Sequence, residues 1–476
     1  DDSAGLFIAD QLMVVGSGLE EGNRNIQTGL SALRIAESSA GQIFNRLNEI
    51  YKRTVRAAND INDPNARASL QREINNLVDA TQKIGTDTEY NGIKLLNGTF
   101  TNKYIHYGPR YGQTVLINIS DIRAQSLGAH IVSGNGRVVT SAANQAISNI
   151  QTNNNNFAVA SGESLRVAGQ VVLGTATTNV ATALVDAAMA ARNINADPTL
   201  QSFGIEAVAK NRSVAQAFTG VVQGDAGDTV SLHFFVGARD VTAANFSITG
   251  ITVNTTLADL VTQINSQASA TNTPVSARAE NGRLVLETTN GETIAIEAQV
   301  TTDAGTTGNV RVNFSQLLQG ASDVTNLANT QRAYAVRVGE LQIYGVDSFV
   351  VNETGIDIVG ATGPDATLNS TFNNLYAINV SDNQNAEIAT LIVKKALQRV
   401  DTVRAQIGAV MNNLQSIYDS QKVALDNTRE AENVIRNTDY AEEMTNFVKL
   451  QIKMQSSMAM LAQANQLPQL VLQLLR

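Results

Sequence analysis

The chain has 476 residues, a formal net charge of −9 and no cysteine. Most single domains have about 50 to 250 residues, so two to four modules are expected. The acidic balance and the lack of a long basic run argue against a nucleic-acid partner, and without cysteine there is no disulfide, thiolate metal site or cysteine nucleophile.

The start of the chain lacks a methionine and lies in what we interpret as the middle of a segment, so we expect further residues before Asp1 in the whole protein. A cleavable signal would need a basic start and an apolar centre, and a membrane span would need about twenty nearly unbroken apolar residues. Neither pattern occurs. No signal peptide and no membrane partner are expected.

Residues 18–58 are predicted to form a helix with a narrow apolar stripe of the coiled-coil kind. Asn62-Asp63-Pro64 then breaks the pattern, and Asp63 can cap a second helix that starts at Pro64. A helical hairpin is therefore expected. Its two stripes consist of Ile26, Leu30, Leu33, Ala36, Ala40, Ile43, Leu47 and Ile50, followed by Leu70, Ile74, Leu77, Ala80 and Ile84.

The apolar period changes after Asn91-Gly92. Residues 104–107 and 115–119 are apolar and β-branched runs around a Gly- and Pro-containing turn, which predicts a small β-hairpin. From about residue 128 to residue 375 short β-branched runs alternate with Gly, Thr and Asn. We expect one or two mostly β modules there, inserted between the helical ends.

Part of this middle region is repeated at an offset of seventy residues, because Ile194-Asn195 matches Ile264-Asn265. Each copy is predicted to form a short helix, a loop and a strand. The second copy is expected to continue through a hairpin over residues 283–297, turning at Asn290-Gly291.

Helix is predicted again over residues 386–436, where apolar residues keep steps of four and three over three heptads. The expected partner of this seam is the stripe near the start of the chain, so that both ends of the sequence pack side by side. The candidate seam residues are Leu33, Ile43, Leu47, Ile50, Val400, Val403, Ile407, Val410, Leu414 and Ile417.

The last stretch, from Asp439 to Arg476, is predicted to be a helix, with no charged residue between Met454 and Leu475. Such a helix must be covered by the other end of the chain, by copies of the same chain or by a partner protein. In isolation it is expected to be largely disordered. The candidate contact residues are Met444, Phe447, Leu450, Met454, Met458, Leu461, Leu467, Leu470 and Leu474.

Catalytic and cofactor-binding patterns are missing from the sequence. His106, His130 and His233 have no second ligand at helical spacing, so no metal site is expected. There is no phosphate-binding loop and no nucleophile elbow. We expect neither an enzyme nor a cofactor.

Both ends of the chain carry motifs that together resemble those of bacterial flagellins. The resemblance covers roughly residues 1–128 and 376–476, and the Ile-Asn repeats of the middle are similar to a flagellin motif of the same letters. The matching segments are Asp1-Asp2-Ser3-Ala4-Gly5-Leu6, residues 86–96 (TDTEYNGIKLL), 105–119, 121–128, 438–443 (TDYAEE) and 460–469 (MLAQANQLPQ), with 472–476.

The resemblance implies an α+β multidomain protein, with terminal halves that pair as an elongated antiparallel helical bundle or coiled coil. Residues 1–128 and 376–437 would form the conserved helical core domain with its β-hairpin. Residues 129–375 would form the variable outer region, and residues 438–476 the filament-core helix that an export chaperone holds.

The implied function is the subunit of the extracellular flagellar filament, exported from the cytoplasm by the flagellar type III system. Implied partners are copies of itself, the export chaperone, and the filament cap and hook–filament junction proteins. Flagellins carry about forty residues of helix before their Asp-Asp motif. If these residues are lacking, the chain is expected to bind the chaperone without forming a stable filament.

Flagellins that Toll-like receptor 5 recognises carry an Arg and a Leu on the first long helix and a Glu on the next. These positions align with Glu49, Arg53 and Glu73, of which Glu73 alone matches. A charge reversed at an interface opposes binding, so weak or no receptor activation is expected.

Three other interpretations stay open on the sequence. The hook–filament junction protein shares the terminal helices, a flagellin with an enzymatic insertion would need a zinc motif, and a secreted coiled-coil scaffold or adhesin would explain the heptads. The last has no reason to end in an uncharged helix.

Overall fold

The computed structural model describes residues 3–174, 183–303, 310–360, 363–437 and 440–475. Asp1, Asp2, Thr438, Asp439 and Arg476, which belong to motifs and boundaries named above, lie outside the described residues. The chain divides into two compact units. One comprises residues 1–39, 88–120 and 403–476, and the other comprises residues 40–87 and 121–402.

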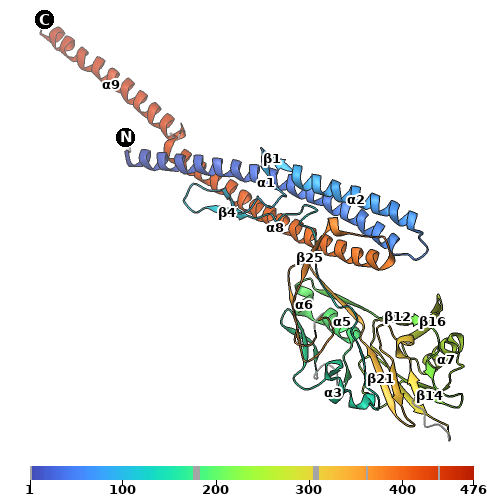
Figure 1. The fold of residues 1–476 in the computed structure, drawn as a ribbon. Coiled ribbons are helices and arrows are strands. Elements are labelled where there is room, and N and C mark those ends of the chain that lie inside the picture. Colours follow the sequence, from blue (N-terminus) through green and yellow to red (C-terminus); the bar gives the residue numbers. More distant parts are fainter. Residues whose placement is uncertain (1–2, 175–182, 304–309, 361–362, 438–439, 476) are drawn as a thin grey trace. The chain divides into compact units, whose positions relative to one another are not determined.

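Helix α1 (Ser3–Ala57) and helix α8 (Asn383–Arg436) run antiparallel along each other, as Figure 1 shows. Their polar contacts show the antiparallel direction, because the partner on α8 moves toward its N-terminus as the position on α1 advances. In the first unit these side-chain contacts are Arg436 to Asp10 at 2.6 Å, Arg429 to Glu20 at 2.7 Å, Gln27 to Tyr418 at 2.8 Å and Arg404 to Glu37 at 2.9 Å.

Helix α1 starts at Ser3, well before the predicted residue 18. Its periodic apolar stripe is buried throughout, and Ile26, Ala36 and Ile50 are fully covered. The sequence prediction located the stripe correctly and missed the turns that precede it, where apolar residues such as Phe7 and Val14 are exposed.

Helix α2 (Pro64–Asp87) begins where the capping signal predicted, since Asp63 Oδ1 accepts the backbone N–H of Ala66 at 2.6 Å. After Ile74 the buried residues of α2 differ from the predicted ones. The expected Leu77, Ala80 and Ile84 are partly buried, and the buried positions are Val78, Thr81 and Gly85. The absent side chain of Gly85 leaves room for Arg123, whose Cγ would lie 2.8 Å from a β-carbon there.

The predicted small hairpin is present as β3 (Lys103–His106) and β4 (Thr114–Ile117), which pair antiparallel. It lies against α1, because two glycines of α1 leave room for it. A β-carbon on Gly22 would overlap the Tyr107 carbonyl, and one on Gly29 would overlap the Ile105 side chain. A second, minimal hairpin is formed by β1 (Glu89–Tyr90) and β2 (Ile93–Lys94).

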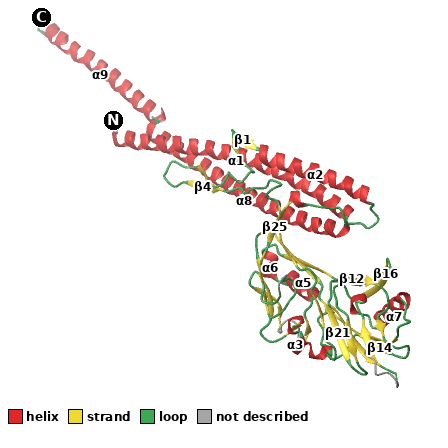
Figure 2. Ribbon diagram, viewed as in Figure 1, coloured by secondary structure: helices red, strands yellow, loops and turns green. Residues whose placement is uncertain are grey.

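Residues 128–374 form the β region, which holds most of the strands drawn in yellow in Figure 2. Its larger sheets have the orders β11-β22-β5-β25, β12-β17-β16, β13-β19-β20, β15-β14-β18-β21-β6 and β24-β23-β8-β9, with the pair β10-β7 beside them. The α+β multidomain class predicted from sequence is confirmed.

The bounds of the elements in this region are β5 Gly128–Ser133, β6 Val138–Thr140, α3 Ile150–Asn153, β7 Ala158–Val159, β8 Ser164–Val167, β9 Gln170–Gly174, β10 Ala183–Leu184, α5 Ala187–Ala196, α6 Pro198–Ser202, β11 Glu206–Lys210, β12 Arg212–Ala217, β13 Val222–Gln223, β14 Thr229–Val236, β15 Phe246–Ile251, α7 Leu257–Ala270, β16 Val275–Glu280, β17 Arg283–Thr288, β18 Ile294–Thr301, β19 Val310–Val312, β20 Val324–Leu327, β21 Arg332–Arg337, β22 Glu340–Gly345, β23 Val350–Thr354, β24 Thr367–Asn369 and β25 Thr371–Asn374. Single turns of 3₁₀ helix occur at Ile147–Asn149, Asn155–Phe157, Phe314–Gln316 and Leu375–Ala377.

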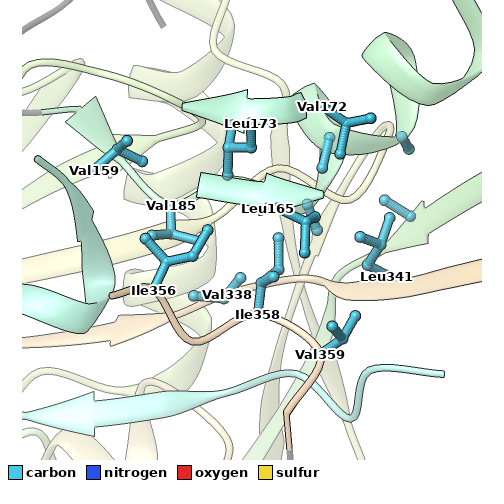
Figure 3. Packing of buried hydrophobic residues seen from close by; sticks show 14 of the residues in the cluster. Val159, Leu165, Val172, Leu173, Val185, Val338, Leu341, Ile356, Ile358 and Val359 are labelled. Carbon is cyan, nitrogen blue, oxygen red and sulfur yellow. The ribbon is translucent and has the colours of Figure 1, made fainter. Parts of the chain in front are cut away.

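Two hydrophobic clusters hold these sheets together. In the first, side chains from β7, β8 and the loop after β23 point toward one another, as Val159, Leu165 and Ile356 do in Figure 3. The second packs α7 against β14, β16, β17 and β18. Most of the apolar residues in both clusters are aliphatic, as the low aromatic content predicts.

The repeat predicted in the middle region corresponds to α5 with β11 and α7 with β16, but the predicted hairpin over residues 283–297 is wrong. Strand β17 pairs with β16 and β12, whereas β18 pairs with β14 and β21. The turn at Asn290-Gly291 therefore links two different sheets. The actual hairpin is β16–β17, which turns at Asn281-Gly282 with φ of 50° and 72°.

The first copy of the repeat lacks this hairpin for a local reason. A two-residue turn of this kind needs positive φ at both positions, which favours Asn-Gly, and the first copy has Asn211-Arg212 instead. Asn211 is buried and bonds to the carbonyl of Glu292 at 2.8 Å. Strand β11 then pairs with β22, and β12 crosses to β17 of the second copy.

Within the second unit, α8 contacts β11 through charges. The Lys395 side chain is fully buried, and its ammonium donates to Glu206 at 2.6 Å. Burial lowers the pKa of Lys395, and the Glu206 carboxylate opposes that shift. A buried charge is tolerated only when such a partner is present, so this pair fixes where β11 meets the helix.

The seam of α1 generates a first prediction. Leu47→Ala should destabilise the helices by roughly 2–5 kcal/mol, because Leu47 is fully buried and its truncation leaves a cavity. Urea unfolding followed by far-UV circular dichroism measures the change. Val423→Ala is the matched control, since Val423 is 59% exposed, and its effect should stay within about 0.5 kcal/mol. Equal effects of the two changes would contradict the buried seam.

Candidate assembly surfaces

Helix α9 (Tyr440–Leu474) presents apolar side chains to solvent along its whole length. Every residue from Ala441 to Leu475 is exposed. The predicted contact residues are exposed by 41% at Met444, 60% at Phe447, 64% at Leu450, 57% at Met454, 59% at Met458, 63% at Leu461, 60% at Leu467, 56% at Leu470 and 85% at Leu474.

The apolar surface of α9 includes more residues than the contact residues predicted from the sequence. Val448, Ile452, Met460 and Leu472 are also exposed, and the first three of these lie outside the helix face that the contact residues from Met444 to Leu461 share. A helix that is apolar on all sides is stable in water only when it is buried on all sides. The surface can therefore accommodate partners around its whole circumference.

Pro468 lies inside α9, and the helix continues through it to Leu474. Proline removes one backbone hydrogen bond and crowds the preceding turn, so this turn is the weakest point of the helix. None of the described helices is long and apolar enough to cross a membrane.

The predicted seam residues lie on α1 and α8. Leu33, Ile43, Leu47 and Ile50 of α1 are buried, each at 1% exposure or less. On α8, Val410 and Ile417 are partly buried, and the buried positions are Val400, Val403, Ile407 and Leu414.

A groove between α1 and the β3–β4 hairpin was not foreseen from the sequence. Its volume is about 420 Å³, and Leu33, Phe100 and Ile105 contribute to its apolar wall. At its mouth Tyr104 is 66% exposed. The signal that could have located it is the pair Gly22 and Gly29 at one face of an otherwise helix-favouring stretch.

The three positions aligned with the receptor patch form one ion-pair network. Arg53 donates to Glu49 of the same helix at 2.8 Å and to Glu73 of α2 at 2.7 Å. Lys52 also contacts Glu49, at 2.9 Å. Hydrogen bonds from Lys52 and Arg53 lower the pKa of Glu49 from 4.5 to about 2. The network joins α1 to α2 and occupies both carboxylates.

The histidines give no metal site in the described part of the chain, where no cluster of three potential ligands occurs. His130 packs against the Phe372 ring at 5.0 Å, and His233 Nδ1 lies 2.6 Å from Ser247 Oγ. Both contacts are structural.

Comparison with known proteins gives matches at both ends and along the whole chain. Residues 1–101 match the bacterial flagellin N-terminal helical region, and residues 390–475 match the bacterial flagellin C-terminal helical region. The chain is 48% identical over 478 residues to the flagellin of Aquifex pyrophilus and 46% identical over 488 residues to that of Aquifex aeolicus (strain VF5). Each alignment covers 100% of this chain and 92% of the relative.

Among solved structures, FliC from Burkholderia pseudomallei matches with a TM-score of 0.31 and 14% identity, covering 81% of this chain and 99% of that one.

The ion-pair network generates a second prediction. In the double variant Lys52→Gln, Arg53→Gln the pKa of Glu49 should rise from about 2 to near 4.5, as measured by NMR titration of its carboxyl carbon. Because folding depresses this pKa, the carboxylate's stabilising effect is present above about pH 4.5 and is lost as the pH falls through about 2. Arg72→Gln on α2 is the control and should leave Glu49 unchanged. An unaltered Glu49 in the double variant would disprove the network.

Proposed function

This chain belongs to the bacterial flagellin family, and on that premise we propose that α9 is held by the flagellar export chaperone before export and is buried among copies of the chain afterwards. As a flagellin, the protein is a structural subunit of the flagellar filament and not an enzyme. The export route, the chaperone, and contacts with the filament cap and hook–filament junction proteins belong to the proposal.

The observation that carries the proposal is the exposure of apolar residues on all sides of α9. One partner groove covers one face of a helix, whereas neighbours in a filament can surround it. A chaperone that covers part of α9 would suppress premature assembly, and several subunits would then complete the cover. Burial supplies about 25 cal/mol per Å² of apolar area before entropic costs.

The proposal also gives a role to each segment of the chain. We assign residues 1–128 and 376–437 to a helical layer whose β3–β4 hairpin meets neighbouring subunits, with Tyr104 and its groove as the contact. Residues 129–375 form the outer region, and residues 438–476 the filament core. The seam from Leu33 to Ile50, with its partners from Val400 to Ile417, keeps the two chain ends together.

The three alternatives drawn from the sequence have less support. Relatives at 46–48% identity over the whole chain are flagellins, which disfavours the junction protein, the scaffold and the adhesin. The family is structural, so an enzymatic insertion has no support.

The chaperone step is tested with single charges on α9. Met454→Asp and Leu461→Asp should each weaken chaperone binding by roughly tenfold or more, since each places a carboxylate in an apolar contact. Isothermal titration of the chain with the purified flagellin chaperone measures this. Gln455→Glu, a charge at a polar position of the same helix, is the control. Unchanged affinity in both Asp variants would refute the chaperone contact.

The filament step is tested in the bacterium with the same three substitutions in its flagellin gene. Electron microscopy should show filaments with Gln455→Glu and none with Met454→Asp or Leu461→Asp, because the core must bury these positions. Normal filaments in both Asp strains would contradict a role of α9 in assembly. The result of the chaperone-binding test would be unaffected.

Receptor recognition gives the next prediction. We propose weak or no activation of Toll-like receptor 5, because Glu49 reverses a charge and Arg53 is engaged by Glu49 and Glu73. A receptor reporter assay should show little signal for the chain. The double variant Glu49→Arg, Arg53→Leu should raise it, and Arg72→Gln should not. A strong response to the unchanged chain at low concentration would overturn this expectation.

A further inference from the structure

The Ile-Asn repeats carry the same side-chain arrangement at two sheet edges. Strands β11 and β16 each stand at one end of their sheet. Asn195 of α5 bonds to Ala207 of β11, accepting its N–H and donating to its carbonyl, both at 2.8 Å. Asn265 of α7 does the same to Ala277 of β16, at 2.7 and 2.8 Å.

Each asparagine amide reproduces what a neighbouring strand would offer. In an antiparallel ladder, a hydrogen-bonded residue exchanges both its N–H and its C=O bond with one opposite residue. The asparagine side chain has the same combination of one acceptor and one donor in reach. It therefore takes the place of that opposite residue.

The isoleucine of each motif holds the amide in register. Ile194 and Ile264 are fully buried in the two separate hydrophobic clusters. Each fixes its helix against the sheet, and the next residue then projects along the strand edge. Asn195 is exposed and Asn265 is half-buried, so solvent reaches both edges.

We infer that the two Ile-Asn motifs close these edges against strand addition by a second copy of the chain. Open strand edges are templates for pairing with another chain. In a filament the outer regions of neighbouring subunits are held together at high effective concentration, which makes an open edge especially costly. The asparagine removes the hydrogen-bonding pair on which such an added strand would register.

Strand β16 depends on its asparagine more than β11 does. At β11 the turn containing Gly291 gives additional cover, since a β-carbon there would overlap the backbone of Ala209 and Lys210. At β16, by contrast, Arg278 and Ala279 are exposed. The charge of Arg278 is neutralised by ion pairs with Glu280 and Glu287. Little net charge is therefore left at that edge to repel an incoming strand.

The test is Asn265→Ala in the whole chain, followed by sedimentation velocity over a range of concentrations. We expect the self-association constant to rise roughly tenfold or more over the unchanged chain, because two backbone groups become free to pair. Far-UV circular dichroism verifies that the variant is folded. Ser266→Ala, at the neighbouring exposed position of α7, is the matched control, and its self-association should stay near that of the unchanged chain.

Two further variants separate edge closure from simple loss of stability. Asn265→Asp keeps the acceptor for Ala277 and adds a charge that repels an incoming strand, so it should not associate. Ser276→Lys on the Asn265→Ala background should restore the original behaviour, since it charges the same edge.

A folded Asn265→Ala protein that associates no more than the unchanged chain would overturn the inference. Equal association of the Ala and Asp variants would do the same, because instability would then be the cause. An unfolded Asn265→Ala protein also counts against it, since the amide would then be a requirement for folding.

Discussion

The antiparallel packing of α1 on α8 is the constraint on which the remaining structure depends. It buries apolar side chains of both helices, such as Leu33 and Leu414, and polar pairs such as Arg429 with Glu20 accompany the same alignment. Burial of this kind is non-directional, whereas the charged pairs favour one alignment. Together they bring the two ends of the sequence side by side, with the β region inserted between them in the chain.

Helix α9 follows the opposite rule, because its apolar residues have no cover within the described chain. A large exposed apolar surface marks an interaction site, and here the surface runs around the helix. The fold thus combines helices whose apolar faces are buried within the chain with one helix, α9, whose apolar surface is left for other molecules to cover. That combination suits a subunit of the flagellar filament.

The repeats in the β region show how one sequence unit can serve two topologies. The second copy closes a hairpin at Asn281-Gly282, and the first copy, with Arg212 in place of the glycine, sends its strand into the sheet of the second. This exchange links two hydrophobic clusters through the backbone. In both copies the asparagine keeps its bond to the strand edge, which suggests that edge protection is independent of the topology around it.

The sequence by itself determined the long helices, the break at Pro64, the β3–β4 hairpin and the apolar end, because these follow from local periodicity and capping. It also supplied the motifs that led to the family. Tertiary structure alone decided that β17 and β18 part at Gly291, that Lys395 is buried against Glu206, and that Asn195 and Asn265 bond to strand edges. Those outcomes depend on which strands meet across many residues, and local propensity carries no information about such pairings.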